Sequence, residues 1–343
     1  MNPTSSRARR FVSACGSILL LTPLATLHAA DRQAATPSIP AAATKPSPRP
    51  AYVPPPPTFP DVAYGKHPKQ VLHFWKAETD KPAPLIVYIH GGAWTGGDRY
   101  KYLNMVLPDA LRHAISVASV EYRFIVEAKA DGEVPPLRGP MMDCARAIQF
   151  LRHKAAEWNI DKSRVAACGG SAGACTSLWI AFHDDLADPT SSDPVSREST
   201  RLFCVGSHRG QTSLDPKQIR AWMPTNVHGH GALGITGDPA RNLTANEVFH
   251  ADRERFLPLI KEFSPYELVS PDDPPVGLYY QTPPAMGQPE KDPVHSANFG
   301  VKLKERCDAL KVPCELVYPG APDVKHATMS DFLIATLKPG ASK

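Results

Sequence analysis

Residues 165–175 read VAACGGSAGAC. The first four residues predict a buried strand, and the small apolar residues after Ser171 predict the start of a helix. Gly169, Ser171 and Gly173 fit the pattern Gly-x-Ser-x-Gly, in which a sharp turn between strand and helix lifts the serine hydroxyl above the sheet. Ser171 is therefore the candidate nucleophile, provided that the rest of the chain builds a sheet around it.

Short apolar runs alternate with longer amphipathic ones from Leu85 onward, which indicates an α/β protein whose mostly parallel strands are linked by crossover helices. The predicted strands are Leu85–Ile89, Ile115–Val120, Val165–Cys168, Leu202–Val205, Val276–Tyr280 and Cys314–Tyr318. Helices are predicted for residues 141–158, where apolar side chains recur at helical spacing, and for residues 296–310. Residues 214–274 are long for a plain connection, so we interpret them as an insertion over the active site.

A second motif, HGGAW, occupies residues 90–94 directly after the strand Leu85–Ile89. Small residues at this place let backbone N–H groups face a developing negative charge. The expected donors are the N–H groups of Gly91, Gly92 and Ala172, and each such donor stabilises a tetrahedral intermediate by about 3 kcal/mol. The two motifs together predict a nucleophilic serine beside an oxyanion hole.

With these motifs the sequence resembles the α/β-hydrolase superfamily, and within it the esterase and lipase branch marked by His-Gly-Gly, which includes hormone-sensitive-lipase-like and feruloyl-esterase-like secreted enzymes. The likeness runs from about residue 64 to residue 337 and includes Tyr122-Arg123 and the sequence DCARA at residues 143–147. It implies the α/β-hydrolase fold, a mostly parallel central sheet with helices on both faces. Ala93 stands where the best-known members have a third glycine, and its Cβ is expected to narrow the pocket.

The resemblance also implies the chain order of a catalytic triad, which is serine, then an acid after the penultimate strand, then histidine after the last strand. His326 follows the strand Cys314–Tyr318 and precedes a terminal helix, so it is the expected base. The acid fits the pattern less well, because the strand Val276–Tyr280 is followed by QTPP rather than by a short turn with an Asp.

Asp292 is the preferred acid, because it is the first Asp on the loop after the penultimate strand. Glu290 on the same loop is the alternative. The two Asp residues at 272–273 precede the strand and belong at the wrong end of the sheet. Asp323 is close to His326 in sequence, but this proximity does not orient an imidazole from the required side.

The N-terminus has the layout of an export signal. Three Arg residues within residues 7–10 precede an apolar run over residues 11–27, and small residues follow. The run is too short and too interrupted for a membrane span, so residues 1–30 are predicted to be a signal peptide and the mature protein to be secreted or periplasmic. Residues 31–60 form a predicted Pro/Ala-rich linker, and residues 61–343 the catalytic domain.

Charge balance and residue spacing suggest no nucleic-acid, membrane-surface or metal partner. Residues 1–30 hold three of the 38 basic residues and none of the 34 acidic ones, so the mature chain is nearly neutral and predicts neither a nucleic-acid partner nor an anionic membrane surface. The six remaining cysteines lack zinc-like spacing and are interpreted as free thiols, with Cys307 and Cys314 as the closest pair. His228 and His230 have no third ligand at suitable spacing, and we expect no metal and no cofactor.

The sequence therefore predicts a serine hydrolase that cleaves carboxylic esters, short-chain or carbohydrate-linked, through an acyl-enzyme on Ser171. Two alternatives stay open. A small-peptide hydrolase shares the same turn around its serine, and a catalytically silent binding protein with this fold is suggested by the displaced acid. The sequence does not determine the oligomeric state.

Overall fold

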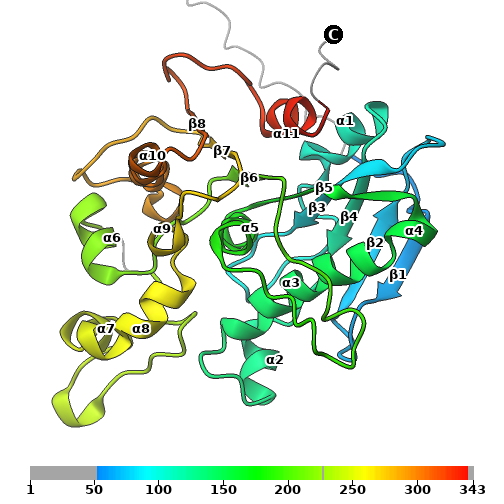
Figure 1. Cartoon of the computed structure of the whole chain (residues 1–343). Coiled ribbons are helices and arrows are strands. Elements are labelled where there is room, and N and C mark those ends of the chain that lie inside the picture. The colour runs from blue at the N-terminus through cyan, green and yellow to red at the C-terminus, as the bar shows by residue number, and fades with distance from the viewer. Residues whose placement is uncertain (1–51, 226–227, 339–343) are drawn as a thin grey trace, which may run out of the picture. The chain divides into compact units, whose positions relative to one another are not determined.

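A computed structural model describes residues 52–225 and 228–338, within which the strands form one eight-stranded sheet (Figure 1). The strand order is β1-β2-β4-β3-β5-β6-β7-β8. Strands β3 to β8 are parallel, whereas β2 pairs antiparallel with both β1 and β4. The strands are β1 (Phe59–Ala63), β2 (Val71–Trp75), β3 (Ala83–Ile89), β4 (Ser116–Val120), β5 (Ile160–Gly170), β6 (Cys204–His208), β7 (Val276–Tyr279) and β8 (Cys314–Val317).

Helices cover both faces of the sheet (Figure 1). The α-helices are α1 (Leu107–Arg112), α2 (Ile125–Ala130), α3 (Arg138–His153), α4 (Ala155–Trp158), α5 (Ala172–Phe182), α6 (Pro216–Trp222), α7 (Ala245–Ala251), α8 (Arg253–Phe263), α9 (Pro265–Leu268), α10 (Asn298–Leu310) and α11 (Met329–Leu337). The 3₁₀ helices are η1 (Leu103–Met105), η2 (Pro239–Arg241) and η3 (Pro293–His295). The buried hydrophobic side chains form two clusters. In β3, Val87 belongs to the cluster that contains residues of α3 and α5, and Tyr88 belongs to the cluster that contains residues of α1 and α11. This alternation along a fully buried strand gives the sheet a core on each face.

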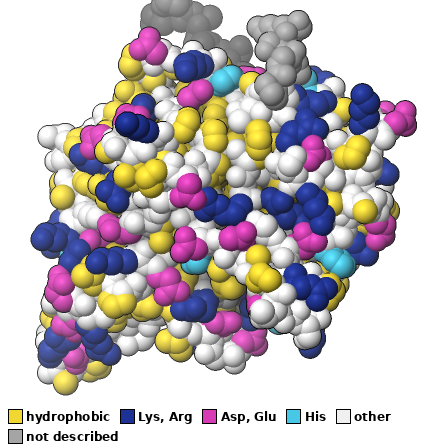
Figure 2. Space-filling view, viewed as in Figure 1, with side chains coloured by type: hydrophobic (Ala, Val, Ile, Leu, Met, Phe, Trp, Pro, Cys, Tyr) yellow, Lys and Arg dark blue, Asp and Glu magenta, His cyan; other side chains and the backbone are white. Residues whose placement is uncertain are grey.

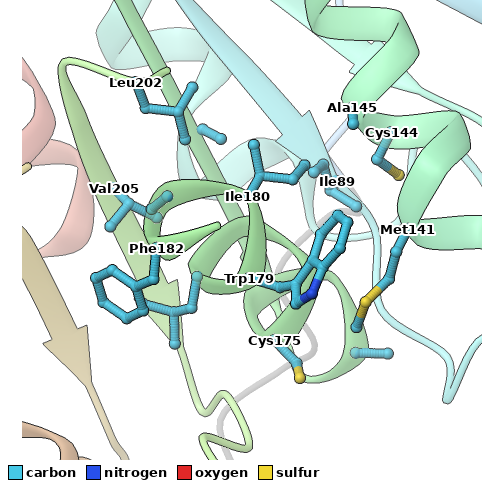
Figure 3. Close-up of a cluster of buried hydrophobic side chains, with 14 of the residues drawn as sticks. Ile89, Met141, Cys144, Ala145, Cys175, Trp179, Ile180, Phe182, Leu202 and Val205 are labelled. Atoms are coloured by element: carbon cyan, nitrogen blue, oxygen red, sulfur yellow. The ribbon is translucent and has the colours of Figure 1, made fainter. Parts of the chain in front are cut away.

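Helix α5 holds the centre of the larger core (Figure 3). All of its residues are buried, and Trp179 packs there beside Met141 and Cys144 of α3. The indole Nε1 of Trp179 donates a 2.8 Å hydrogen bond to the carbonyl oxygen of Glu262. Because α5 begins directly after Ser171, the packing of this helix holds the backbone of the candidate nucleophile in place.

The structure confirms the mostly parallel sheet and each of the six predicted strands. It adds β1 and β2 at the N-terminal edge, and β1 begins at Phe59 inside the expected linker. Phe59 packs against Trp158 with ring centroids 4.9 Å apart, so the folded domain starts before residue 61. Residues 1–51 lie outside the described residues, and the signal peptide and most of the linker stay predictions.

Two of the residues that carried the family resemblance form a buried ion pair. The Arg123 guanidinium donates to both carboxylate oxygens of Asp143, at 2.9 and 2.7 Å, and the Arg123 backbone N–H donates to the same carboxylate. Gln70 supplies a further donor to Asp143 at 2.7 Å. The hydrogen bonds satisfy a carboxylate that is 2% exposed, so these residues have a structural role in the fold.

On the face shown in Figure 2, acidic and basic side chains are interspersed, in agreement with a nearly neutral chain. Within residues 52–225 and 228–338 no helix is long and apolar enough to cross a membrane. The six cysteines in this part of the chain are free thiols.

Candidate active site

Ser171 stands on a strained turn between β5 and α5. Its φ of 54° and ψ of −120° lie outside the regions that L-residues prefer, and the turn exists because glycines surround it. A Cβ on Gly169 would lie 2.2 Å from the carbonyl oxygen of Ile89, and one on Gly173 would lie 2.0 Å from the same atom. The Ser171 N–H donates to the carbonyl oxygen of His208 at 2.9 Å, which ties the turn to β6.

His295 is the imidazole that meets this serine. Its Nε2 lies 2.9 Å from Ser171 Oγ, and its Nδ1 lies 2.9 Å from both carboxylate oxygens of Asp292. A proton on Nδ1, directed at the carboxylate, leaves the Nε2 lone pair to accept the serine O–H. The three side chains thus form a continuous hydrogen-bonded chain from carboxylate to hydroxyl.

The expected base, His326, lies elsewhere, and this corrects the sequence prediction. Its Nδ1 faces the carboxylate of Glu315 on β8 at 3.0 Å, and its carbonyl oxygen accepts from the Tyr279 hydroxyl at 3.2 Å. The hydrogen bond to Ser171 Oγ is made by His295 instead. The turn after β8 therefore brings His326 back to Glu315 on the preceding strand.

Asp292 lies on the predicted loop, but it contacts His295 rather than His326. The one-turn helix η3 explains the pairing, because residues three apart eclipse each other in a 3₁₀ turn. The missed signal is this Asp-x-x-His spacing, which places a carboxylate and an imidazole on one side of a single turn. Asp292 also forms an ion pair with Arg209, at 2.5 Å between Oδ2 and Nη2.

The loop that carries this pair is anchored at several points. Gln211 Nε2 donates to the carbonyl oxygen of Val294 at 2.7 Å, and the Gly287 N–H donates to the carbonyl oxygen of Trp222 in α6 at 2.9 Å. Glu290, the alternative acid, accepts from the Ser296 hydroxyl and from Asn298 Nδ2. Glu290 thereby braces the loop against the start of α10.

The predicted oxyanion donors lie around the serine. Gly91 must be glycine here, because its Cβ would lie 2.5 Å from the carbonyl oxygen of Gly170. Gly92 has a φ of 131°, and Ala172 is the first residue of α5, whose N–H has no acceptor within the helix. Gly91 and Gly92 line the same cavity as Ser171, which fits the expected oxyanion hole.

Buried polar contacts support the oxyanion loop from behind. The His90 ring is fully buried, with Nδ1 3.0 Å from the carbonyl oxygen of Gly91 and Nε2 3.3 Å from Glu121. The Tyr122 hydroxyl donates to the His90 carbonyl oxygen at 2.7 Å. Ala93 lines the cavity as expected from its extra Cβ, and its φ of 55° continues the strained backbone of this loop.

The cavity above Ser171 has a volume of about 600 Å³. Its described lining comes from the last residues of β5 and β6 and from the connections after β3, β5, β6 and β7, and none of it comes from residues 214–274. The insertion is close to the site, because His295 acts on the charge of its His228. Its α6 supports the loop that carries His295, through the Trp222 carbonyl oxygen.

A second cavity of about 500 Å³ shares Met105 and His208 with the first. Burial, together with the nearby Arg209 and His295, lowers the pKa of His208 to about 4. His228 also has a pKa lowered to about 4, by burial and by His230 and His295. Within the described residues no group of three or more His, Cys, Asp or Glu side chains could hold a metal ion.

The BD-FAE family model matches residues 73–282, more than half of the chain. The chain belongs to the BD-FAE family. This is a hormone-sensitive-lipase-like family of α/β-hydrolase esterases. The match includes Ser171 and the oxyanion loop of this BD-FAE protein, and it ends before Asp292, so the loop that supplies the imidazole lies outside it.

This BD-FAE protein is similar to curated esterases over part of its length. It is 30% identical to Esterase LipC of Mycobacterium tuberculosis over 39% of its own chain and 30% of that protein. It is 36% identical to an arylesterase of Saccharolobus solfataricus over 32% of its chain and 35% of that protein. The chain thus spans about a third of the length of these relatives.

A solved structure covers more of the chain. The truncated form of a carbohydrate esterase from gut microbiota superposes with a TM-score of 0.59 at 18% identity, over 81% of this chain and 95% of that one. At this identity the likeness shows the α/β-hydrolase fold alone.

Proposed function

We propose that this protein hydrolyses carboxylic esters through an acyl-enzyme on Ser171, with His295 as the base and Asp292 as the acid that orients it. The observation that carries the proposal is the chain of 2.9 Å contacts from Asp292 through His295 to Ser171 Oγ. The names of the similar proteins, an esterase and an arylesterase, support the ester class of substrate.

In the first half of the reaction, Ser171 Oγ attacks the ester carbonyl carbon while His295 Nε2 takes the hydroxyl proton. The carbonyl oxygen becomes an oxyanion, which the N–H groups of Gly91, Gly92 and Ala172 stabilise by about 3 kcal/mol each. When the tetrahedral intermediate collapses, His295 returns the proton to the leaving alcohol. Asp292 holds the imidazolium that exists between these two steps.

In the second half, water replaces the alcohol. His295 takes a proton from the water, which attacks the acyl carbon, and the acid product leaves as Ser171 regains its proton. We propose short-chain acyl or carbohydrate-linked esters as substrates. A cavity of about 600 Å³ supports this, because it has room for a sugar ring.

Replacement of the nucleophile tests the proposal. Ser171→Ala should abolish the hydrolysis of 4-nitrophenyl acetate and the covalent labelling by a fluorophosphonate probe, with little change in the midpoint of thermal unfolding, because the hydroxyl serves chemistry rather than packing. Ser163→Ala is the matched control, because Ser163 lies at the other end of β5 and is exposed. Labelling that persists in Ser171→Ala would overturn the proposal, and wild-type protein that resists the probe would favour a silent binding protein.

We also propose that residues 1–30 direct export and that the enzyme acts in the periplasm or outside the cell. The support is the arrangement of Arg residues, apolar run and small residues in the sequence. Mass spectrometry of the N-terminus of the mature protein tests this, and an intact residue 1 on protein recovered from its native host would contradict it.

A further inference from the structure

Positive charge lies on two walls of the cavity above Ser171. Lys101 belongs to the connection after β3, and Arg209 directly follows β6. Because β3 and β6 are the two neighbours of β5 in the sheet, these cations flank the nucleophile at the end of β5 from opposite sides. No carboxylate side chain is among the described residues that line the cavity.

Most N–H donors of the Arg209 guanidinium are not used by hydrogen bonds within the described residues. Its Nη2 binds Asp292, and no other hydrogen bond of the guanidinium occurs within the described part of the chain. A guanidinium has five N–H donors in a planar fork, so most of them remain for a molecule in the cavity. The backbone of Arg209 has a φ of 56°, and its N–H donates to the carbonyl oxygen of Tyr279 at 2.8 Å, which fixes where the side chain begins.

Lys101 is also free of acidic partners among the described residues. Its Nζ lies 5.8 Å from the centroid of the Tyr102 ring. The Lys101 backbone is held in place, because its N–H bonds to Asp98 and its carbonyl oxygen accepts from the Tyr88 hydroxyl at 2.7 Å. An unpaired ammonium thus stands on a fixed backbone at the cavity wall.

We propose that this cavity selects esters that also carry a free carboxylate, which Lys101 and Arg209 bind. The inference rests on the proposed ester hydrolysis and names its substrate class. A carboxylate matches the planar fork of Arg209, and charge-assisted hydrogen bonds are about twice as strong as neutral ones. The carboxylate can belong to the acyl part or to the alcohol part of the ester, because one cation lies on each side of Ser171.

Two matched pairs of substrates test the proposal and distinguish these sources. The acyl pair is mono-4-nitrophenyl adipate against its neutral methyl ester, and the alcohol pair is 4-acetoxybenzoate against 4-acetoxybenzamide. For at least one pair, kcat/KM of the anionic member should exceed that of the neutral member by about 10-fold at low salt. The preference should shrink in about 0.5 M NaCl, because screening weakens the attraction between partly exposed charges.

Variants of Lys101 test whether this lysine causes the preference for anionic esters. Lys101→Gln should lower the ratio of anionic to neutral kcat/KM by about 3- to 10-fold, and Lys101→Arg should retain most of it, because the charge is kept. Lys76→Gln is the matched control and should leave the ratio unchanged. Lys76 is exposed and follows β2 where Trp75 pairs with Val117, at the end of the sheet opposite Ser171.

The outcomes separate this inference from the proposed function. Hydrolysis that depends on Ser171 but treats both members of each pair alike, within about twofold, overturns the inference and leaves ester hydrolysis standing. A preference that survives Lys101→Gln unchanged overturns the role of Lys101. Failure of all four esters to be hydrolysed by a Ser171-dependent reaction overturns the proposed function, and the inference with it.

Discussion

The loop after β7 and the loop after β8 each carry a histidine whose Nδ1 faces a carboxylate. His295 lies 2.9 Å from Asp292, and His326 lies 3.0 Å from Glu315. The two histidines differ in their other ring nitrogen, because Nε2 of His295 meets Ser171 Oγ and Nε2 of His326 has no hydrogen-bond partner among the described residues. A histidine and carboxylate pair is therefore common to both loops, and contact with the nucleophile distinguishes them.

The loops also differ in how they are held. The loop after β7 is bonded to residues from outside itself, through Val294 to Gln211 and through Gly287 to α6. The loop after β8 has fewer such anchors, of which the Tyr279 hydroxyl on the His326 carbonyl oxygen is one. A base must stay within hydrogen-bond reach of its serine, and the better anchored loop is suited to that task.

Exchanging the two histidines for alanine should produce the largest difference between the loops. His295→Ala should lower kcat for an activated ester by about 10⁴-fold or more, because the hydroxyl loses its proton acceptor. His326→Ala should change kcat by less than about 3-fold, because that ring does not reach the serine. Steady-state kinetics with 4-nitrophenyl acetate measures both.

The reverse result would break the comparison. A large loss in His326→Ala with little change in His295→Ala would return the role of base to the position that chain order predicts. Circular dichroism of both variants is the folding control, because it distinguishes a loss of activity caused by unfolding from one caused by the missing imidazole.

The carboxylates provide the next largest contrast. Asp292→Asn should lower kcat by about 10³-fold, because an amide favours the wrong imidazole tautomer and cannot stabilise the imidazolium. Glu315→Gln is the matched change on the other loop and should alter kcat by less than about 3-fold. A large loss in Glu290→Gln, with little effect of Asp292→Asn, would instead assign the acid to Glu290.

The part of the site that the sequence predicts is local. Ser171, Gly91 and Gly92 lie directly after strands of strong apolar character, and a Cβ on Gly91 or Gly92 would collide with a backbone oxygen atom. Asp292 is predicted because it is the first Asp after the predicted strand Val276–Tyr280, and the apolar run of that strand is easy to recognise. Ser171, Gly91 and Gly92 can be placed because each lies directly after a strand, whereas Asp292 is placed only by its order along the chain.

The base is not predicted, because its position depends on the path of a loop. Residues 281–297 have no periodicity from which a path could be derived, and their anchors come from Gln211 and Trp222, far away in sequence. Chain order therefore selects His326, which has the right place along the chain but another partner. The short strands β1 and β2 are missed for a similar reason, since the pairing of β1 with β2 and of β2 with β4, rather than a local pattern, defines them.

His208 lies between the two loops and gives the smallest predicted effect. Its imidazole lines the cavity of Ser171 and the cavity bordered by the loop after β8. Its pKa is lowered from 6.5 to about 4, first by burial and then by Arg209 and His295. Between these two values the unfolded chain binds a proton that the folded chain does not, so His208 makes the fold less stable as the pH falls from 6.5 towards 4.

His208→Gln should therefore flatten the loss of stability on acidification. A shift of this size corresponds to at most about 3 kcal/mol, and partial exposure of the ring reduces the expected gain to about 1 kcal/mol at pH 4.5 relative to pH 7. Urea unfolding at both pH values measures it, with the exposed His153→Gln as control. Identical pH dependence in His208→Gln and the wild type would refute the prediction. The pKa of His208 also compares the two loops. His295→Ala should raise it in an NMR titration and His326→Ala should leave it unchanged, because His295 is among the charges that act on His208 and His326 is not.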